Sequence, residues 1–226
     1  MRLMVKSLIT YISYSITILF SLIAWFYFNA TEETKYFSYV SILVAISSIL
    51  YLTGIIARDV GQYGIYAGLS SLAGFVFLAM NFILLIAIHK TLYTRVGGTA
   101  YTMLPFLAPI ILANGSTKPV IYIIFGFIGM AFALTIISVY MAVSLALERK
   151  GGSLFWYLIS SYTILVFFVI FSAGLFMFLE EVGAIAQGTG AVIHSSLYAV
   201  SSAVLAASGW YYNKVLHPKI QRLKQL

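Results

Sequence analysis

The most constraining feature of the sequence is the spacing of its charged residues, which leaves seven long uncharged stretches. These stretches are 7–31, 36–57, 60–89, 96–117, 119–147, 151–179 and 182–213. A helix needs about 20 predominantly apolar residues to cross the hydrocarbon core of a bilayer. Charged residues make up only 8% of the chain, against about 25% in an ordinary soluble domain. The sequence therefore predicts an integral membrane protein and excludes a soluble enzyme, a disordered chain and a nucleic-acid-binding module.

Six of the seven stretches contain an obvious hydrophobic helix. We expect these helices at 8–29, 37–57, 64–89, 119–147, 154–179 and 188–212. The predicted fold is an all-α polytopic transmembrane helix bundle. Residues 1–213 form its single transmembrane domain, and residues 214–226 form a short basic tail. Tyr and Trp gather at the predicted helix ends, where amphipathic rings lie at the level of the lipid headgroups.

Residues 99–115 decide whether the bundle has seven spans or six. Their apolar centre, 103–113, is short, and Pro105 and Pro109 each remove a helix hydrogen bond. The sequence Asn-Gly-Ser-Thr-Lys-Pro at 114–119 is a strong turn signal that would join two helices of a hairpin. We favour a seventh span at 99–115. The alternative is six spans with this segment re-entrant or interfacial.

The basic residues do not separate the two topologies. Seven spans with an external N-terminus place nine of the 13 basic residues inside, and six spans with an internal N-terminus also place nine inside. Basic residues concentrate on the cytoplasmic side of membrane proteins. Both topologies therefore place the C-terminal tail in the cytoplasm, and we expect the protein in the cell membrane.

No Asp, Glu, Lys or Arg lies in the middle of a predicted span. Such residues are needed in ion antiporters that use buried carboxylates, in voltage sensors and in retinal proteins, which bind retinal through a lysine. Their absence from the predicted spans argues against these three classes of protein. The chain also has no Cys, which excludes disulfides, iron–sulfur clusters and thiolate zinc sites. We therefore expect no catalytic residue and no metal site, and the sequence argues against an enzyme.

Two histidines remain as candidate cofactor ligands. His194 lies inside the last span on one helical row with Tyr198 and Ser202, and His89 ends the third span. A histidine among hydroxyl groups can hold haem iron or a quinone oxygen, but polar groups in membranes more often bond to a neighbouring helix. One haem b held by both histidines needs them at one depth, which only the six-span topology permits. We expect no cofactor, with haem b as the alternative.

Two further patterns concern helix packing. Small residues recur every four positions in the last span, at Ala191, Ser195, Ala199, Ala203 and Ala207. Such residues let helix backbones approach closely in a membrane. Asn81, in the middle of the third span, is expected to bond another helix or, with Tyr198 and Ser202, to line a polar path.

The leading functional prediction is a non-catalytic subunit that packs within a larger membrane protein assembly. The alternative is a channel or facilitator for a small neutral solute, with Asn81 in its path. A second alternative is an electron-transfer subunit that binds haem b or quinone through His194. The expected partners are the lipid bilayer and other membrane subunits or further copies of this chain, and not nucleic acid.

Overall fold

The computed structural model describes residues 2–93, 134–144, 146–147, 153–181, 183–186 and 188–224. Within these ranges the chain is helical and has no β-strand. Five of the described helices are long and apolar enough to cross a membrane. The prediction of an all-α helix bundle is therefore confirmed for the described residues, and their long apolar helices fit a membrane protein. The segment 99–115, on which the count of seven spans depends, lies outside the described residues.

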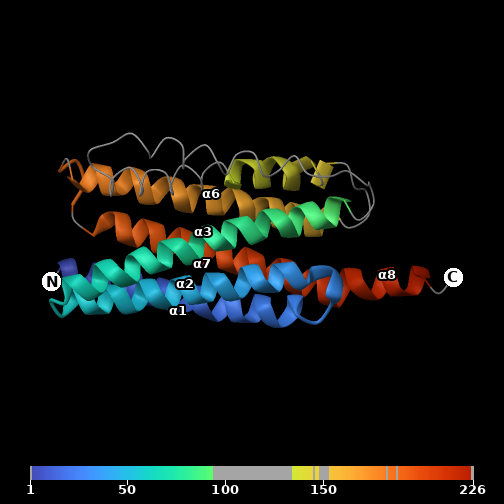
Figure 1. The fold of residues 1–226 in the computed structure, drawn as a ribbon, viewed down its shortest axis with the longest axis horizontal. Coiled ribbons are helices and arrows are strands. Elements are labelled where there is room, and N and C mark those ends of the chain that lie inside the picture. The colour runs from blue at the N-terminus through green and yellow to red at the C-terminus, as the bar shows by residue number, and fades with distance from the viewer. Residues whose placement is uncertain are drawn as a thin grey trace.

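The helices follow the spans expected from the sequence. The long helices are α1 (Arg2–Phe28), α2 (Lys35–Asp59), α3 (Tyr63–Tyr93), α6 (Ser153–Glu181) and α7 (Thr189–Tyr211). A 3-10 turn, η1 (Glu32–Thr34), joins α1 to α2, and a five-residue π-helix, η4 (Tyr212–Leu216), continues α7 into α8 (His217–Lys224) (Figure 1). The sixth predicted helix, at 119–147, is described as the helical segment Leu134–Ser144.

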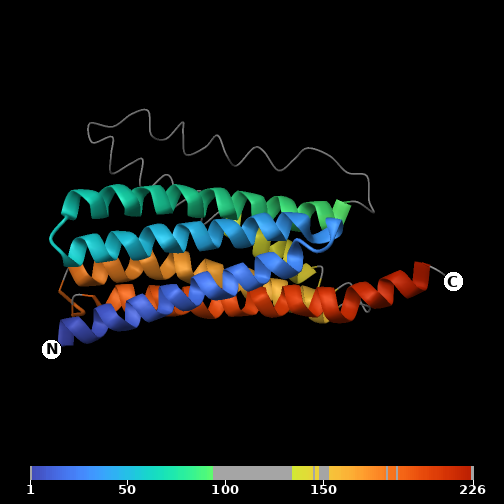
Figure 2. The same cartoon turned by 90° about the horizontal axis from the view of Figure 1, so that it is seen from below.

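The long helices lie along one common axis and pack side by side (Figures 1 and 2). α1 packs against α2 and α7, α2 packs against α3, and α6 packs against α7. α1 and α7 are parallel. Nζ of Lys6, near the start of α1, lies 2.9 Å from Oγ1 of Thr189 at the start of α7. At the other end of both helices, a Cβ built on Gly209 would lie 3.2 Å from the ring of Phe28.

The end of α3 and the beginning of α6 lie at the same end of the bundle. Lys90 of α3 donates a hydrogen bond to the hydroxyl of Tyr36, at the start of α2. Phe155, at the start of α6, packs against Phe37, the next residue of α2, with ring centroids 6.0 Å apart. We refer to this end as the η1 end, and to the opposite end as the α2–α3 end.

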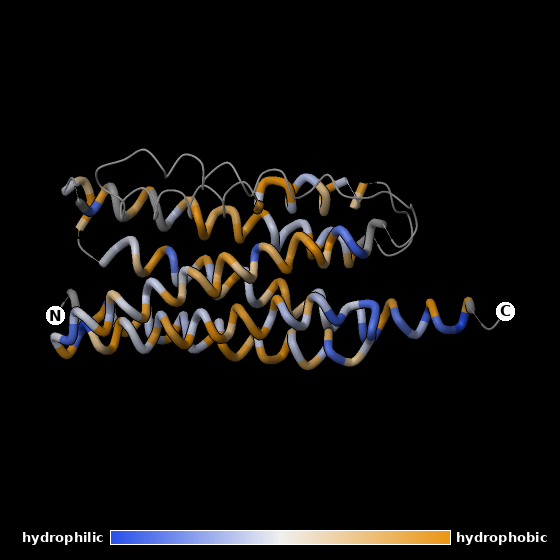
Figure 3. The backbone as a smooth tube through the Cα atoms, in the orientation of Figure 1, coloured by the Kyte–Doolittle hydropathy of each residue, from blue (hydrophilic) through white to orange (hydrophobic). Residues whose placement is uncertain are grey.

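Large apolar side chains cover the outside of the bundle, as expected of helices in contact with lipid. Ile12, Leu19 and Phe26 of α1 are each more than half exposed. Figure 3 shows hydrophobic residues along the helices and hydrophilic ones gathered at the two ends and on α8. The apolar surface therefore forms a band between two polar ends, which is the distribution that a bilayer requires.

Many buried side chains are instead small hydroxyl residues. Thr17 donates a hydrogen bond of 2.8 Å to the carbonyl oxygen of Ser13, and Ser48 donates one of 2.8 Å to Val44. The hydrocarbon core offers no water to an unpaired hydroxyl, so a bond to the preceding turn satisfies it within its own helix. The hydroxyl residues bonded in this way can lie between closely packed helices without an unpaired polar group.

Gly190 of α7 should not tolerate a side chain. A Cβ at this position would lie 2.8 Å from Cβ of Phe176 and 2.9 Å from Oε1 of Glu180. We expect Gly190→Ala to lower the free energy of unfolding in detergent by about 1–3 kcal/mol, the usual cost of overpacking. The control is Gly68→Ala on α3, where a Cβ meets no atom within 4 Å. Equal losses of thermal stability in the two variants would contradict the assigned contact.

Candidate functional site

An aromatic cluster lies between the helices in the half of the bundle nearer the α2–α3 end. It consists of Tyr14 of α1, Tyr51 of α2, Phe77 of α3, and His194 and Tyr198 of α7. The rings of Tyr14 and Tyr51 stack with centroids 5.9 Å apart, and the ring of His194 lies 6.1 Å from Tyr51 and 6.0 Å from Tyr198. Residues four apart share one face of a helix, which is why His194 and Tyr198 enter the same cluster.

His194 links two helices. Its Nδ1 lies 3.2 Å from the carbonyl oxygen of Val169 on α6, so a neutral ring with the proton on Nδ1 donates this bond. The same carbonyl oxygen also accepts a hydrogen bond of 2.8 Å from Ser172 of its own helix. His194 is therefore engaged in an α6–α7 contact at the depth where the sequence placed a candidate ligand.

Tyr198 and Ser202 occupy the next turn of α7, and both are buried. The hydroxyl of Tyr198 lies beside Ser47 of α2, but no hydrogen bond of good geometry joins the two. Ser47 donates to the carbonyl oxygen of Ala73 on α3, at 3.2 Å. Ser202 donates to the carbonyl oxygen of Ala199, at 2.8 Å. The Ser47 bond therefore joins α2 to α3, whereas the Ser202 bond stays within α7.

Asn81 forms a second, separate polar contact. It is fully buried, its Nδ2 donates to the carbonyl oxygen of Phe77 at 2.9 Å, and its Oδ1 accepts a bond of 3.1 Å from Oγ1 of Thr135. Thr135 belongs to the helical segment Leu134–Ser144. The sequence could not identify this partner, because the depth of Thr135 in the membrane depends on the number of spans before it.

The structure does not bring His89 and His194 together. His89 precedes Lys90, which bonds Tyr36 at the η1 end, whereas His194 contacts Tyr51. Tyr36 and Tyr51 are 15 residues apart on α2, which is about 22 Å along a helix axis. This separation is too large for the two axial ligands of one haem.

The small-residue row of α7 winds around the helix rather than following one face. Ser195 is buried, Ala191, Ala199 and Ala203 are partly buried, and Ala207 is exposed. Four residues advance a helix by more than one turn of 3.6 residues, so a row with this period rotates away from any fixed neighbour. The buried residues of α7 are Gly190, Ser195, Tyr198, Ser201, Ser202, Leu205, Ala206, Ser208 and Gly209.

Hydrogen bonds join the start of α7 to α1 and α6 at the α2–α3 end. Glu180, near the end of α6, accepts hydrogen bonds from the backbone N–H groups of Gly188, at 3.2 Å, and Gly190, at 2.6 Å. A carboxylate at the start of a helix pairs N–H groups that otherwise have no partner and interacts favourably with the helix dipole. Together with the bond from Lys6 to Thr189, this cap fixes the entry of α7. Neither contact could be predicted from the sequence, because each joins residues of different helices.

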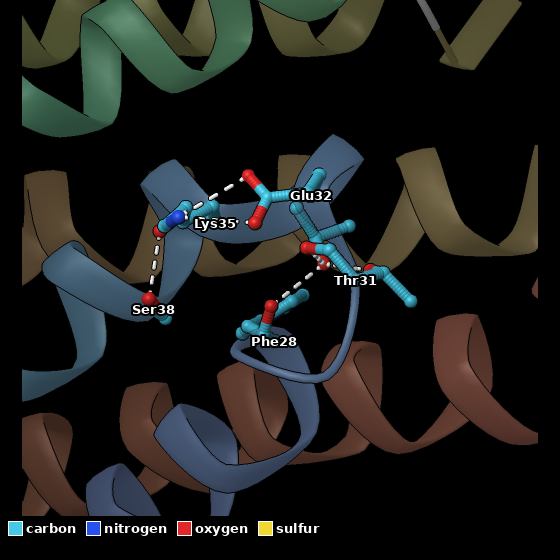
Figure 4. Close-up of polar contacts among 6 residues, drawn as sticks. Phe28, Thr31, Glu32, Lys35 and Ser38 are labelled. Carbon is cyan, nitrogen blue, oxygen red and sulfur yellow. Dashed lines mark hydrogen bonds and ion pairs between the residues drawn. The ribbon is translucent and has the colours of Figure 1, made fainter.

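Polar contacts stabilise the turn that connects α1 to α2 at the η1 end (Figure 4). Oγ1 of Thr34 donates to the carbonyl oxygen of Phe28 at 2.9 Å and lies 2.6 Å from Oγ1 of Thr31. Lys35 pairs with the carboxylate of Glu32 at 3.0 Å. Thr34 thereby pairs the carbonyl group of Phe28 at the end of α1, and these contacts stabilise the short turn between α1 and α2.

The described residues contain no group of three His, Cys, Asp or Glu side chains that could hold a metal ion. A shallow apolar hollow of about 320 Å³ lies on the outer face of α1, between Tyr11 and Leu19, away from the aromatic cluster. Comparison of the chain with protein-family models, curated proteins and solved structures found no match.

The bond from His194 to Val169 predicts a mild effect for His194→Gln. An amide can still donate across the α6–α7 contact, and measured interhelical bonds in membrane proteins average about 0.6 kcal/mol. We therefore expect little change in thermal stability and no change in the visible absorption spectrum. A haem-type spectrum in the wild-type protein that disappears in His194→Gln would contradict this assignment.

Proposed function

We propose that the protein is a non-catalytic integral membrane subunit that packs with other membrane helices in a larger assembly. The observation that carries this proposal is the outward face of α3 near the α2–α3 end. Gly64, Ala67, Gly68 and Ser71 are all exposed there, and a Cβ at Gly64 or Gly68 would meet no atom within 4 Å. The Gly-x-x-x-Gly spacing of Gly64 and Gly68 is the pattern that lets two helices approach closely in lipid.

The polar interior supports a structural role over a solute pathway. The polar atoms of Asn81 bond to Phe77 and Thr135, and His194 bonds to the backbone of α6. A pathway for a solute needs polar groups that face the solute, whereas these groups join one helix to the next. The same bonds would hold the bundle in a defined shape for assembly with a partner.

We further infer seven spans, because α3 ends and α6 begins at the η1 end. The chain between two such helices crosses the membrane an even number of times. Spans at 99–115 and 119–147 provide two crossings, whereas the six-span alternative provides one. The parallel directions of α1 and α7 support the same inference, since the first and last spans of a chain are parallel only when the number of spans is odd.

The segment Leu134–Ser144 supports the crossing at 99–115. Thr135 bonds Asn81 and therefore lies at the level of Asn81 in the bundle. Asn81 precedes Lys90, at the η1 end, by nine residues, which is about 13 Å along α3. Five residues, 148–152, separate Leu147 from α6 and can bridge about 20 Å. If the helix ran from Thr135 toward the α2–α3 end, Leu147 would lie about 30 Å from the start of α6. Five residues cannot bridge that distance. The segment therefore runs toward the η1 end, which is the direction that the seven-span topology predicts for 119–147.

In this topology the η1 end faces the cytoplasm. It carries Lys35, Lys90 and the basic residues of α8, and the seven-span topology assigns nine of the 13 basic residues of the chain to its side. At the α2–α3 end, Arg58 pairs with Asp59 at 2.9 Å. This asymmetry follows the preference of basic residues for the cytoplasmic side and supports a cytoplasmic C-terminus.

The proposal predicts that Gly68→Leu disrupts the assembly. A leucine on the close face of α3 should weaken association with a partner helix by about 5- to 150-fold, the equivalent of 1–3 kcal/mol of overpacking. Native gel migration after extraction of source membranes in mild detergent measures the effect. The control is Ala207→Leu, which enlarges an exposed residue of α7 and should leave the assembly intact. Wild-type protein that is extracted only as a monomer would contradict the proposal.

A further inference from the structure

The last helix of the protein extends beyond the bundle. α7 does not stop at the η1 end but continues through η4 into α8, which projects past the other helices (Figures 1 and 2). Pro218 explains the π-helix before it. Proline has no N–H for the carbonyl group of Lys214, and its ring crowds that carbonyl group. Proline and π-helical turns are the usual sites of helix bending.

The beginning of α8 is tied to the bundle, whereas its end is not buried. Nδ1 of His217 lies 3.7 Å from Oε2 of Glu33 in η1, and Tyr212 is buried. Past Pro218, the side chains of Lys219, Gln221, Arg222 and Leu223 are all exposed. The junction therefore begins against the bundle, contains a proline and ends exposed.

The exposed part of α8 is amphipathic. Ile220, which is partly buried, and Leu223 are three residues apart, so they lie on one side of α8, below Leu216 of η4, which packs against the core. Leu223 is 73% exposed. Lys219 and Arg222 lie next to this apolar side, and the sequence from Tyr212 to the C-terminus has no acidic residue. An apolar side next to cations and free of acidic residues fits the interface of an anionic lipid leaflet.

We propose that α8 bends at Pro218 and lies on the cytoplasmic leaflet of the membrane. Ile220 and Leu223 enter the headgroup region, and Lys219 and Arg222 contact the phosphates of anionic lipids. The leaflet is within reach because α8 begins where α7 leaves the bundle. This inference concerns a different surface from the α3 face, and it takes only the cytoplasmic side of the η1 end from the proposed topology.

Two single-cysteine variants of the full chain test the proposal, since the natural sequence has no Cys. Leu223→Cys carries an environment-sensitive fluorophore on the apolar side of α8, and Gln221→Cys carries it on the other side. The proteins are reconstituted in phosphatidylcholine vesicles with and without phosphatidylserine. We expect a lipid-borne quencher to reduce the fluorescence at 223 much more than at 221, and more strongly with phosphatidylserine. Equal access of an aqueous quencher to both labels in the anionic vesicles would overturn the proposal.

Charge-removing variants separate a lipid surface from other sources of phosphate. Lys219→Gln and Arg222→Gln should each lower the ratio of membrane-bound to free α8 by about fivefold, because each basic residue near an anionic surface contributes about that factor. Both residues are exposed, so the unfolding temperature of the bundle should not change.

Inorganic phosphate added to the vesicles should leave the fluorescence unchanged. Displacement of the label from the membrane by phosphate would overturn the lipid surface as the binding partner.

Discussion

The parallel packing of α1 against α7 is the contact on which the rest of the bundle depends. It joins the beginning of the chain to its last span and so closes the helices into one body. Lys6 and Thr189 fasten it at one end, the rings of Tyr14 and Tyr198 meet in the middle with centroids 6.4 Å apart, and Gly209 permits close approach at the other end. The direction of every other helix is then constrained by the turns that connect it.

The membrane explains how the polar side chains of this bundle are used. A buried polar group in hydrocarbon has no water to pair with, so it must find a partner in its own helix or in a neighbour. Thr17 and Ser48 use their own helix, whereas His194 and Asn81 reach across to α6 and to Thr135. Polar groups engaged in this way hold the helices of this chain together.

Much of the fold could be predicted because charges are excluded from the hydrocarbon core. The intervals between charged residues give α1, α2, α3, α6 and α7 with ends that differ from the structure by a few residues. Helicity in the basic tail was not predicted. A tail of this composition has no hydrophobic interval long enough to signal a helix, and the helical form of α8 follows from its continuity with α7.

The candidate site was less predictable than the fold, because its contacts depend on pairing in three dimensions. The sequence identified His194 and Asn81 as unusual residues but could not supply Val169 or Thr135 as their partners. It also placed Ala207 on the packing row, although this residue is exposed. A row with a period of four drifts around a helix of 3.6 residues per turn, so only the neighbouring helix decides which part of the row is buried.

The most direct test of the central claim is the sidedness of two exposed turns at the α2–α3 end. Parallel α1 and α7 require the α2–α3 turn and the α6–α7 turn to face the same side of the membrane. Gln62→Cys and Ala184→Cys, made singly in this naturally Cys-free chain, place one exposed thiol in each turn. A membrane-impermeant maleimide should label both variants from outside intact cells. Labelling of Ala184→Cys alone, with Gln62→Cys reactive only after permeabilisation, would contradict the parallel arrangement and support six spans.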